Sequence, residues 1–307
     1  MSAAATLSPK SLPKSPLDFQ WDCIRQNIGT WHGSFSQFSP SGELVKDTPS
    51  VLTLEETDPG KMMVLTLERF PEAGEKKINR LTFTAPGPAP YTYYFESGAF
   101  SQGSAQWSSF GQFAIEVSLK VGDRRVRYVI MYEGTSHYTS QLKYVTLICE
   151  TQEGGTQFVE KSLSAELLLG KWEGSAKVIY STGEPFTTGT SQWQMRKDLA
   201  LSCQEQFDDR TQVLSVASDV EGTVSSETMI QLNATEENQL DYQLMLLSNG
   251  AYCLLPQEIK RETAFRVEVG WVSAQGDRQR LIRYYDTRGV WTNTALINAQ
   301  QTSLLKK

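Results

Sequence analysis

The chain has 307 residues, of which 39% are hydrophobic and 21% charged, and its formal net charge is −6. Acidic and basic residues are interspersed, which argues against a nucleic-acid binder, because such proteins present a basic face. Four widely separated cysteines and only two histidines make a metal site or a histidine-dependent triad hard to build. We therefore expect no metal and no cofactor.

No apolar run approaches the roughly 18 residues that a membrane-spanning helix needs, so we expect no membrane span. Without a recognisable secretion signal, we expect a cytoplasmic protein. Residues 1–16 contain Ser, Pro, Ala and Lys but no acidic residue, which predicts a flexible tail. From Leu17 to Ile28, the apolar residues fall on one face of a helix.

A long-range repeat follows this predicted helix. Gly-Thr-Trp at 29–31 returns as Gly-Lys-Trp at 170–172, 141 residues later, and Gly-Asp-Arg at 122–124 returns at 276–278. Solenoid units are about 20–50 residues long, so this spacing indicates one whole domain made twice. We predict the following division of the chain: a tail at 1–16, a first domain at 17–150, a linker at 151–161 and a second domain at 162–307.

After each Gly-x-Trp, the hydrophobic period changes from that of a helix to that of a strand. Short extended runs alternate with turn signals such as Ser-Gly, Asp-Pro-Gly, Pro-Gly-Pro and Gly-Asp. This pattern predicts an antiparallel meander in each domain, and closing a meander into a barrel removes its exposed edges. The predicted fold is all-β, with two tandem up-and-down barrels, each preceded by a short helix.

A short helix, a Gly-x-Trp that opens the first strand and a late arginine resemble the lipocalin (calycin) superfamily. In that superfamily the tryptophan packs across the closed end of the barrel, beneath the arginine. The resemblance implies this place for Trp31 and Trp172, with Arg127 and Arg280 as the matching arginines. The tandem pair is also similar to an uncharacterised, mainly cyanobacterial family of two-domain lipocalin-like proteins, over about residues 17–300. That family offers no catalytic residues to carry over.

In the late strand of the first copy, Val126, Tyr128, Ile130 and Tyr132 alternate with a more polar set. The apolar set is expected to line the inside of the first barrel, because side chains of a strand alternate between two faces.

Aligning the two copies places Leu281, Arg283 and Tyr285 inside the second barrel. A guanidinium is costly to bury without a partner. Arg283 is therefore expected either to pair with an interior carboxylate or to await the carboxylate of an amphipathic ligand, with Tyr285 as a second donor. The Arg-x-Tyr spacing is similar to that of fatty-acid-binding proteins, although here it occurs one strand earlier.

These features predict that a barrel, the second in preference to the first, binds a small hydrophobic or amphipathic ligand of the tetrapyrrole, isoprenoid or fatty-acid class. No catalytic residue can be assigned. The expected ligand-binding residues are Arg283, Tyr285, Leu281, Trp271, Tyr132 and Tyr128.

Two alternatives stay open. The first is a non-redox lyase, cyclase or isomerase that acts on such a ligand, with acids and bases drawn from Tyr285, Arg283, His137, Glu116 and Glu268. The second is a protein-interaction scaffold in which large side chains fill the barrels, since small barrels need such side chains to fill their interiors.

Overall fold

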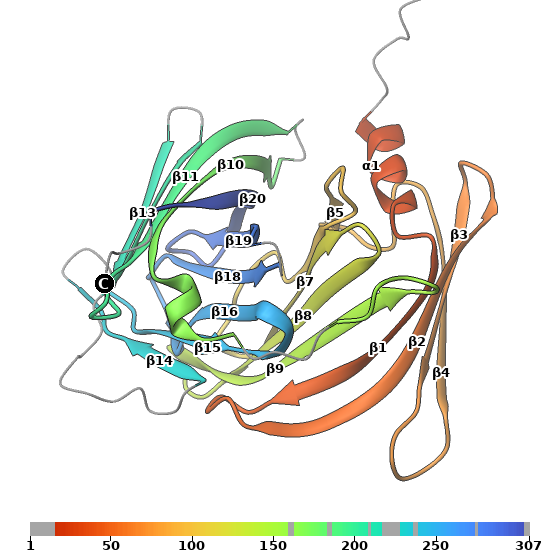
Figure 1. Cartoon of the computed structure of the whole chain (residues 1–307), viewed down its shortest axis with the longest axis horizontal. Helices are drawn as coiled ribbons and strands as arrows, with labels where there is room; N and C mark the ends of the chain where they lie inside the picture. The colour runs from red at the N-terminus through yellow and green to blue at the C-terminus, as the bar shows by residue number, and fades with distance from the viewer. Residues whose placement is uncertain are drawn as a thin grey trace, which may run out of the picture.

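The computed structural model describes residues 16–158, 163–182, 186–207, 210–216, 228–235, 239–273 and 276–303. Most of the predicted tail and part of the predicted linker lie outside these ranges. The described chain is almost entirely antiparallel β-structure, as predicted (Figure 1).

The first domain contains one helix and nine strands among the described residues: α1 (Pro16–Arg25), β1 (Gly29–Phe38), β2 (Leu44–Asp58), β3 (Met62–Arg69), β4 (Lys77–Thr84), β5 (Tyr93–Tyr94), β6 (Phe100–Gly103), β7 (Gln112–Val121), β8 (Arg124–Gly134) and β9 (Thr139–Gln152). The predicted helix ends earlier than expected, at Arg25. Beyond it, Asn27 and Ile28 donate to carbonyls three residues back, which forms turns instead of an α-helix.

The second domain repeats this order: η1 (Ala165–Leu168), β10 (Gly170–Tyr180), β11 (Thr187–Met195), β12 (Leu201–Phe207), β13 (Arg210–Val216), β14 (Met229–Leu232), β15 (Tyr242–Leu246), η2 (Ser248–Gly250), β16 (Ala251–Pro256), β17 (Glu258–Lys260), β18 (Phe265–Val272), β19 (Arg278–Tyr285) and β20 (Trp291–Ser303). The short helix expected before the second Gly-x-Trp is the 3₁₀ turn η1.

Each domain is a curled sheet whose first and last long strands are neighbours. The first sheet runs β4-β3-β2-β1-β9-β8-β7-β6-β5, and the second runs β13-β12-β11-β10-β20-β19-β18-β16-β15-β14. Both are therefore half-barrels, consistent with the two predicted barrel domains. Among the described strands the curl does not close, because β4 does not pair with β5 and β13 does not pair with β14.

The two Gly-x-Trp motifs occupy equivalent positions. Gly29 and Gly170 open β1 and β10 with φ of 126° and 102°, a backbone region that favours glycine. The indole N–H of Trp31 donates to the Asn27 carbonyl at 2.9 Å, and that of Trp172 donates to the Leu168 carbonyl at 3.2 Å. Each tryptophan is thus anchored to the chain four residues earlier, which supports the duplication.

We call the face of each sheet that carries its Gly-x-Trp tryptophan the inner face, and the opposite face the outer face. Helix α1 covers one end of the inner face of the first sheet, where Trp21 lies edge-on to Phe83 with ring centroids 6.1 Å apart. The side-chain amide of Gln20 bonds both the N–H and the C=O of Tyr94, at 2.8 and 3.0 Å. The helix therefore caps the edge of the sheet at β5.

The two sheets meet along a contact that we call the seam. Strands β7–β9 of the first sheet lie against β16, β18 and β19 of the second (Figure 1). The seam also carries backbone bonds: β17 pairs with β9 of the first sheet, and Trp107 N–H donates to the Gly289 carbonyl at 2.7 Å. One large hydrophobic cluster runs through both domains, so they share a core.

Candidate functional site

An arginine stacks on the tryptophan in both copies, but it is not the arginine that the resemblance implied. The guanidinium of Arg125 lies 4.3 Å from the centre of the Trp31 ring. In the second domain, Arg278 lies 3.8 Å from the Trp193 ring and 5.3 Å from the Trp172 ring. The assignment to Arg127 and Arg280 is therefore wrong by two residues along the strand. These two arginines share the inner face but lie further along β8 and β19.

Buried ion pairs occupy the inner face of the first sheet. Glu150 is fully buried and pairs with Arg125 and with Arg127, each at 2.7 Å. Arg127 also pairs with Glu116 at 2.8 Å. Burial alone would raise the pKa of Glu150, but the two arginines outweigh this effect and lower it. The network holds β7, β8 and β9 together from the inside.

A denser network fills the second inner face. Arg280 pairs with Glu268 at 2.7 Å and with Glu205 at 3.0 Å, and Arg266 pairs with both carboxylates at 3.0 Å. Burial would raise the pKa of Glu268, but Arg280 and Arg266 outweigh it and lower the pKa to about 2. Glu268 therefore stays ionised at neutral pH, with its oxygens bonded to guanidinium groups. Such a group is suited to brace the wall.

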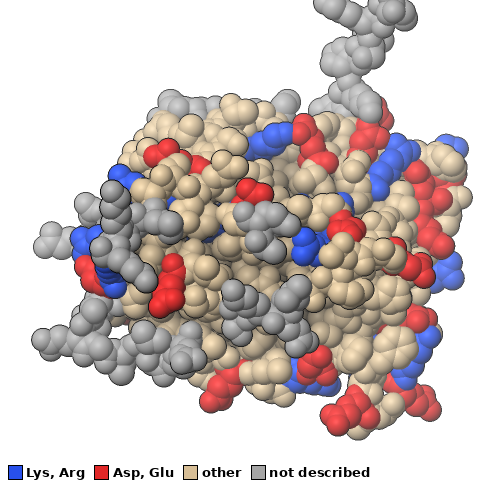
Figure 2. All heavy atoms as spheres, in the orientation of Figure 1, with Lys and Arg blue, Asp and Glu red and all other residues tan. Residues whose placement is uncertain are grey.

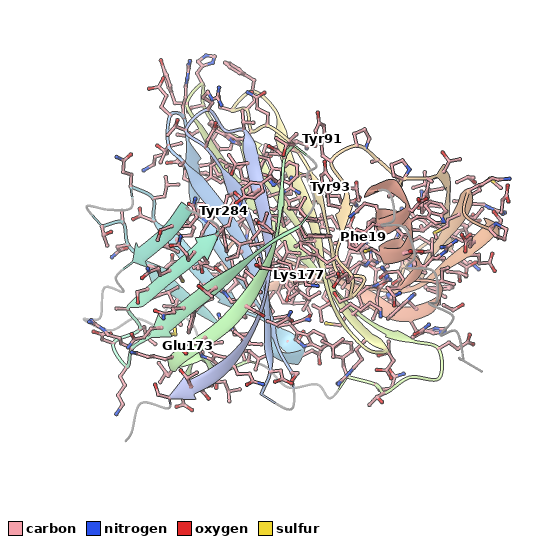
Figure 3. The ribbon with its side chains drawn as sticks, turned by 90° about the horizontal axis from the view of Figure 1, so that it is seen from above. Phe19, Tyr91, Tyr93, Glu173, Lys177 and Tyr284 are labelled. Atoms are coloured by element: carbon pink, nitrogen blue, oxygen red, sulfur yellow. The ribbon has the colours of Figure 1, made fainter. Side chains whose placement is uncertain are left out.

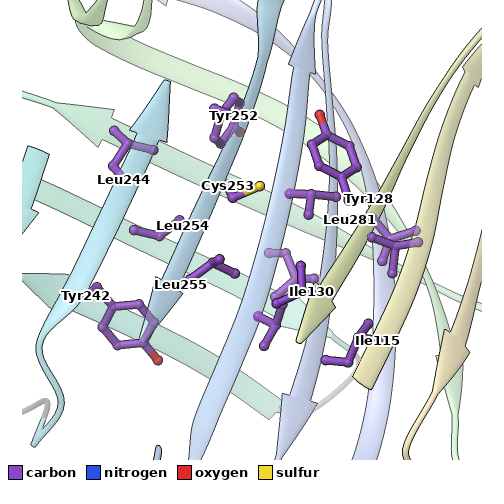
Figure 4. Packing of buried hydrophobic residues seen from close by; sticks show 14 of the residues in the cluster. Ile115, Tyr128, Ile130, Tyr242, Leu244, Tyr252, Cys253, Leu254, Leu255 and Leu281 are labelled. Carbon is purple, nitrogen blue, oxygen red and sulfur yellow. The ribbon is translucent and has the colours of Figure 1, made fainter. Parts of the chain in front are cut away.

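The expected position of the apolar set on β8 is wrong. Tyr128 donates to the Gly270 carbonyl at 2.7 Å and Tyr132 to the Pro256 carbonyl at 2.6 Å, so both cross the seam into the second domain. Figure 4 shows Tyr128 and Ile130 packed with residues of the second sheet, among them Leu281. Arg125 and Arg127 of β8 face inward because their carboxylate partners lie there. The apolar set faces outward, where the second domain buries it.

Arg283 also lies in the seam, so its expected place inside the second barrel is wrong as well. It is fully buried, and it donates to Ser101 Oγ at 2.6 Å and to the Tyr285 hydroxyl at 3.0 Å. Tyr285 in turn donates to the Ser104 carbonyl at 3.0 Å. The guanidinium lies 4.7 Å from the Trp291 ring. Its hydrogen-bond partners among the described residues are neutral, and they tie β19 to the β6 region of the first domain.

The other expected ligand-binding residues lie on the same outer face. Leu281 is 1% exposed in the seam, and Trp271 donates its indole N–H to the Asn249 carbonyl at 3.0 Å, close to Phe158. The structure thus brings the predicted set together along one seam. Figure 3 shows Tyr91, Tyr93 and Lys177 along this boundary, where both tyrosines contact Trp291 and Lys177 pairs with Glu96.

A pocket that sequence reasoning missed opens on the inner face of the first sheet, away from α1. It has a volume of about 330 Å³ and contains no Asp or Glu in its lining, which comprises Phe35, Gln37, Lys46, Thr48, Arg69, Pro71, Lys77, Val129, Tyr144 and Thr146. Arg69 lies over the Phe35 ring at 5.9 Å. The basic run at the start of β4, Lys-Lys-Ile-Asn-Arg, is the signal that could have drawn attention to it.

The surface as a whole has no single charge sign. Figure 2 shows acidic and basic side chains interspersed over the face that it presents. Within the described ranges, no group of three or more His, Cys, Asp or Glu residues could hold a metal ion. No helix of the described chain is long and apolar enough to cross a bilayer.

Comparisons with known proteins give two different family descriptions for the two halves. Residues 18–155 match the N-terminal domain of unknown function DUF3598. Residues 160–302 match the C-terminal domain of "Biogenesis factor required for ATP synthase 1". The comparison with curated proteins found no match.

Two solved structures show how far the likeness extends. A protein of unknown function from the DUF3598 family of Nostoc punctiforme is 29% identical, with a TM-score of 0.77, and the alignment covers 92% of this chain and 99% of that one. A porin mutant of Rh. blastica is 9% identical over 89% of this chain and 98% of its own, with a TM-score of 0.16. Only the first likeness bears on the fold, and it extends over both domains.

Proposed function

We propose that the chain is a protein-binding scaffold that acts in the assembly of ATP synthase, and that it contacts its client through the open part of the first half-barrel. The suggestion of ATP synthase comes from the similarity of residues 160–302 to a biogenesis factor for that enzyme. The suggestion of a scaffold comes from the structure of the first sheet.

The observation that carries the proposal is the exposure of large apolar side chains along β2–β4 and in the loop after β3. Their exposed fractions range from 38% to 65%, and the residues are Leu44, Val45, Phe70, Ile78 and Leu81. Apolar surface that a folded protein leaves exposed can serve as a contact area for another protein. Figure 1 shows these strands extending on the side of the molecule opposite the second domain.

The contacts in the rest of the molecule are those of a rigid body that holds this surface in place. The inner faces carry buried ion pairs, and Arg283, Tyr128 and Tyr132, which were expected to hold a small ligand, donate hydrogen bonds across the seam instead. The pocket of about 330 Å³ on the first inner face is lined by neither Arg283 nor Tyr285. Binding of a small hydrophobic ligand stays a prediction, which native mass spectrometry of the chain from its natural host can test.

The test of the scaffold proposal is a binding assay with isolated soluble subunits of ATP synthase, each immobilised in turn, at physiological salt. We expect saturable binding of at least one subunit by the full chain. We expect this binding to weaken when Ile78 and Leu81 are both changed to Asn, because the change removes apolar area that is 59% and 46% exposed. Absence of binding to every subunit would refute the role in ATP synthase assembly.

A further inference from the structure

Strand β4 is an open edge of the first sheet. Among the described residues, β4 pairs with β3 on one side and with no strand on the other. The β3–β4 ladder continues into a bond from Ala85 N–H to the Lys61 carbonyl at 3.2 Å. In an antiparallel ladder, alternate residues bond to the partner strand, so Ile78, Arg80 and Thr82 turn their N–H and C=O groups away from β3.

At the opposite edge of the same sheet, the backbone groups are already bonded. At β5, the Gln20 side chain occupies both backbone groups of Tyr94, so this edge is already capped by α1. From Lys77 to Thr82, every side chain of β4 is exposed. One edge of the half-barrel is thus capped, while the other presents free backbone groups that can pair with another extended chain.

The charge that lines the pocket beside this edge is positive. Lys46, Arg69 and Lys77 line the pocket of about 330 Å³ on the inner face, next to the start of β4, and the lining has no acidic residue. The Nε of Arg69 is buried and has no hydrogen-bond partner within the described ranges. The neighbouring acids point the other way: Asp47 accepts from Ser36 Oγ, and Glu68 pairs with Lys76.

This charge decides which kind of chain fits the edge. A second copy of the protein, paired through its own β4 about Arg80, would bring the two Arg80 side chains face to face, and like charges facing across strands destabilise the pairing. The same positive charges would attract an acidic chain. The pocket also offers Phe35 and Val129, against which the aliphatic part of an acidic side chain can pack.

We propose that β4 and the adjoining basic pocket bind an extended acidic segment of a protein partner. The segment adds to the free edge as a further strand, through the outward N–H and C=O groups of Ile78, Arg80 and Thr82. Since side chains of a strand alternate between faces, every second residue of the segment faces the inner side, where carboxylates meet Lys77 and Arg69. This inference rests on the proposed function, because it names the chemistry of the client contact.

The experiment measures the fluorescence anisotropy of a short labelled peptide of alternating Glu and Thr, titrated with the full chain. The central variant is Thr82→Pro, because proline removes an outward N–H and its ring blocks the approaching strand, while the bonds to β3 remain. The matched control is Thr82→Val, which changes the same side chain and keeps the N–H. We expect Thr82→Pro to weaken binding by about tenfold or more, and Thr82→Val to weaken it by less than about twofold.

A second variant tests the charge independently of the backbone. Arg69→Gln combined with Lys77→Gln should weaken binding of the Glu peptide by about tenfold or more, and a peptide of alternating Lys and Thr should not bind the wild type. The charge control is Lys61→Gln, in the β2–β3 turn. A circular dichroism spectrum like that of the wild type shows that each variant is folded. Equal binding by the wild type and Thr82→Pro, or equal binding of the Glu and Lys peptides, would overturn the inference.

The same variants separate this inference from the proposed function. If an ATP synthase subunit binds the wild type and Thr82→Pro equally, the scaffold proposal stands and the edge-strand inference fails. If the Glu peptide binds in the expected pattern but no subunit does, the edge is a docking site for an acidic chain and the client must be sought elsewhere.

Discussion

Replacing Glu268 by Gln should cost a large part of the stability of the chain. Glu268 is fully buried and accepts three short hydrogen bonds from Arg266 and Arg280, at 2.7 to 3.0 Å. The isosteric amide keeps the volume but removes the charge, which leaves Glu205 as the remaining carboxylate for both arginines in this network. Breaking a buried pair by removing one partner costs about 3–5 kcal/mol.

The pKa of Glu268 points in the same direction. Arg280 and Arg266 outweigh the effect of burial and lower this pKa from 4.5 to about 2 on folding. A carboxylate whose pKa is lowered on folding stabilises the folded state in its ionised form. Because the folded pKa is the lower one, this contribution is fully present above about pH 4.5 and is lost as the pH falls towards 2.

The assay is urea unfolding at pH 7 followed by tryptophan fluorescence, with Glu133→Gln as the control. Glu133 pairs with Lys143 on the surface, where both side chains are about half exposed, so its loss should cost less than about 1 kcal/mol. We expect Glu268→Gln to lower the free energy of unfolding by about 3 kcal/mol. If the two variants differ by less than about 1 kcal/mol, the assignment of Glu268 as a charged brace is refuted.

Three further predictions follow from individual contacts. Arg280→Met should lower the free energy of unfolding by about 3–5 kcal/mol, because it leaves buried carboxylates without a partner. Arg283→Met should change the free energy of unfolding by less than about 1.5 kcal/mol, because the hydrogen-bond partners of Arg283 are neutral; equal losses for the two variants in urea unfolding would contradict this contrast. Tyr128→Phe should cost about 1–3 kcal/mol by leaving the Gly270 carbonyl without its 2.7 Å bond, and an unchanged unfolding midpoint would argue against a bond across the seam. Carboxyl NMR should place the pKa of Glu56 well below the ordinary 4.5, because Arg25 and the Gly60 N–H bond to its charged form; the contact with α1 should therefore persist above pH 4.5 and weaken as the pH falls towards 2, and an ordinary pKa would contradict it.

The repeat predicted the architecture because its signals are local. A glycine with positive φ and a tryptophan at the start of a strand are needed in each copy, so both remain visible as Gly-x-Trp at 29–31 and 170–172. The period-two pattern likewise predicted strands with tight turns between them. These features depend on residues close together in the chain, which is why they can be read from the sequence.

The sequence could not show which face of β8 is the inner one. Alternation on β8 shows that Tyr128 and Tyr132 share a face, but it does not show whether that face lies inside its own barrel or against the other domain. The decision depends on where Glu150 and Glu116 place their charges, on two other strands. Glu116 and Glu268 do keep a common spacing between the copies, and this shared position was the available sign of an inner carboxylate.

The candidate site escaped prediction for a related reason. A run of basic residues at Lys76 and Lys77 is consistent with any solvated turn. Its meaning depends on β4 being the last strand of the sheet, and therefore on the curl staying open between β4 and β5. Openness is a property of the whole sheet, so no local pattern encodes it.

Because the two sheets pack back to back along the seam, the two copies depend on each other. Each copy alone would present the apolar outer face of its late strands to water, so neither half is a self-sufficient unit. The chain is in effect a dimer fused into one polypeptide, and fusion released the two halves from being identical. Ile130 and Arg283 occupy corresponding places, and a true homodimer would have to carry the same side chain at both. The fused pair can place a guanidinium on one side of the seam only, where Arg283 bonds Ser101 of the first domain.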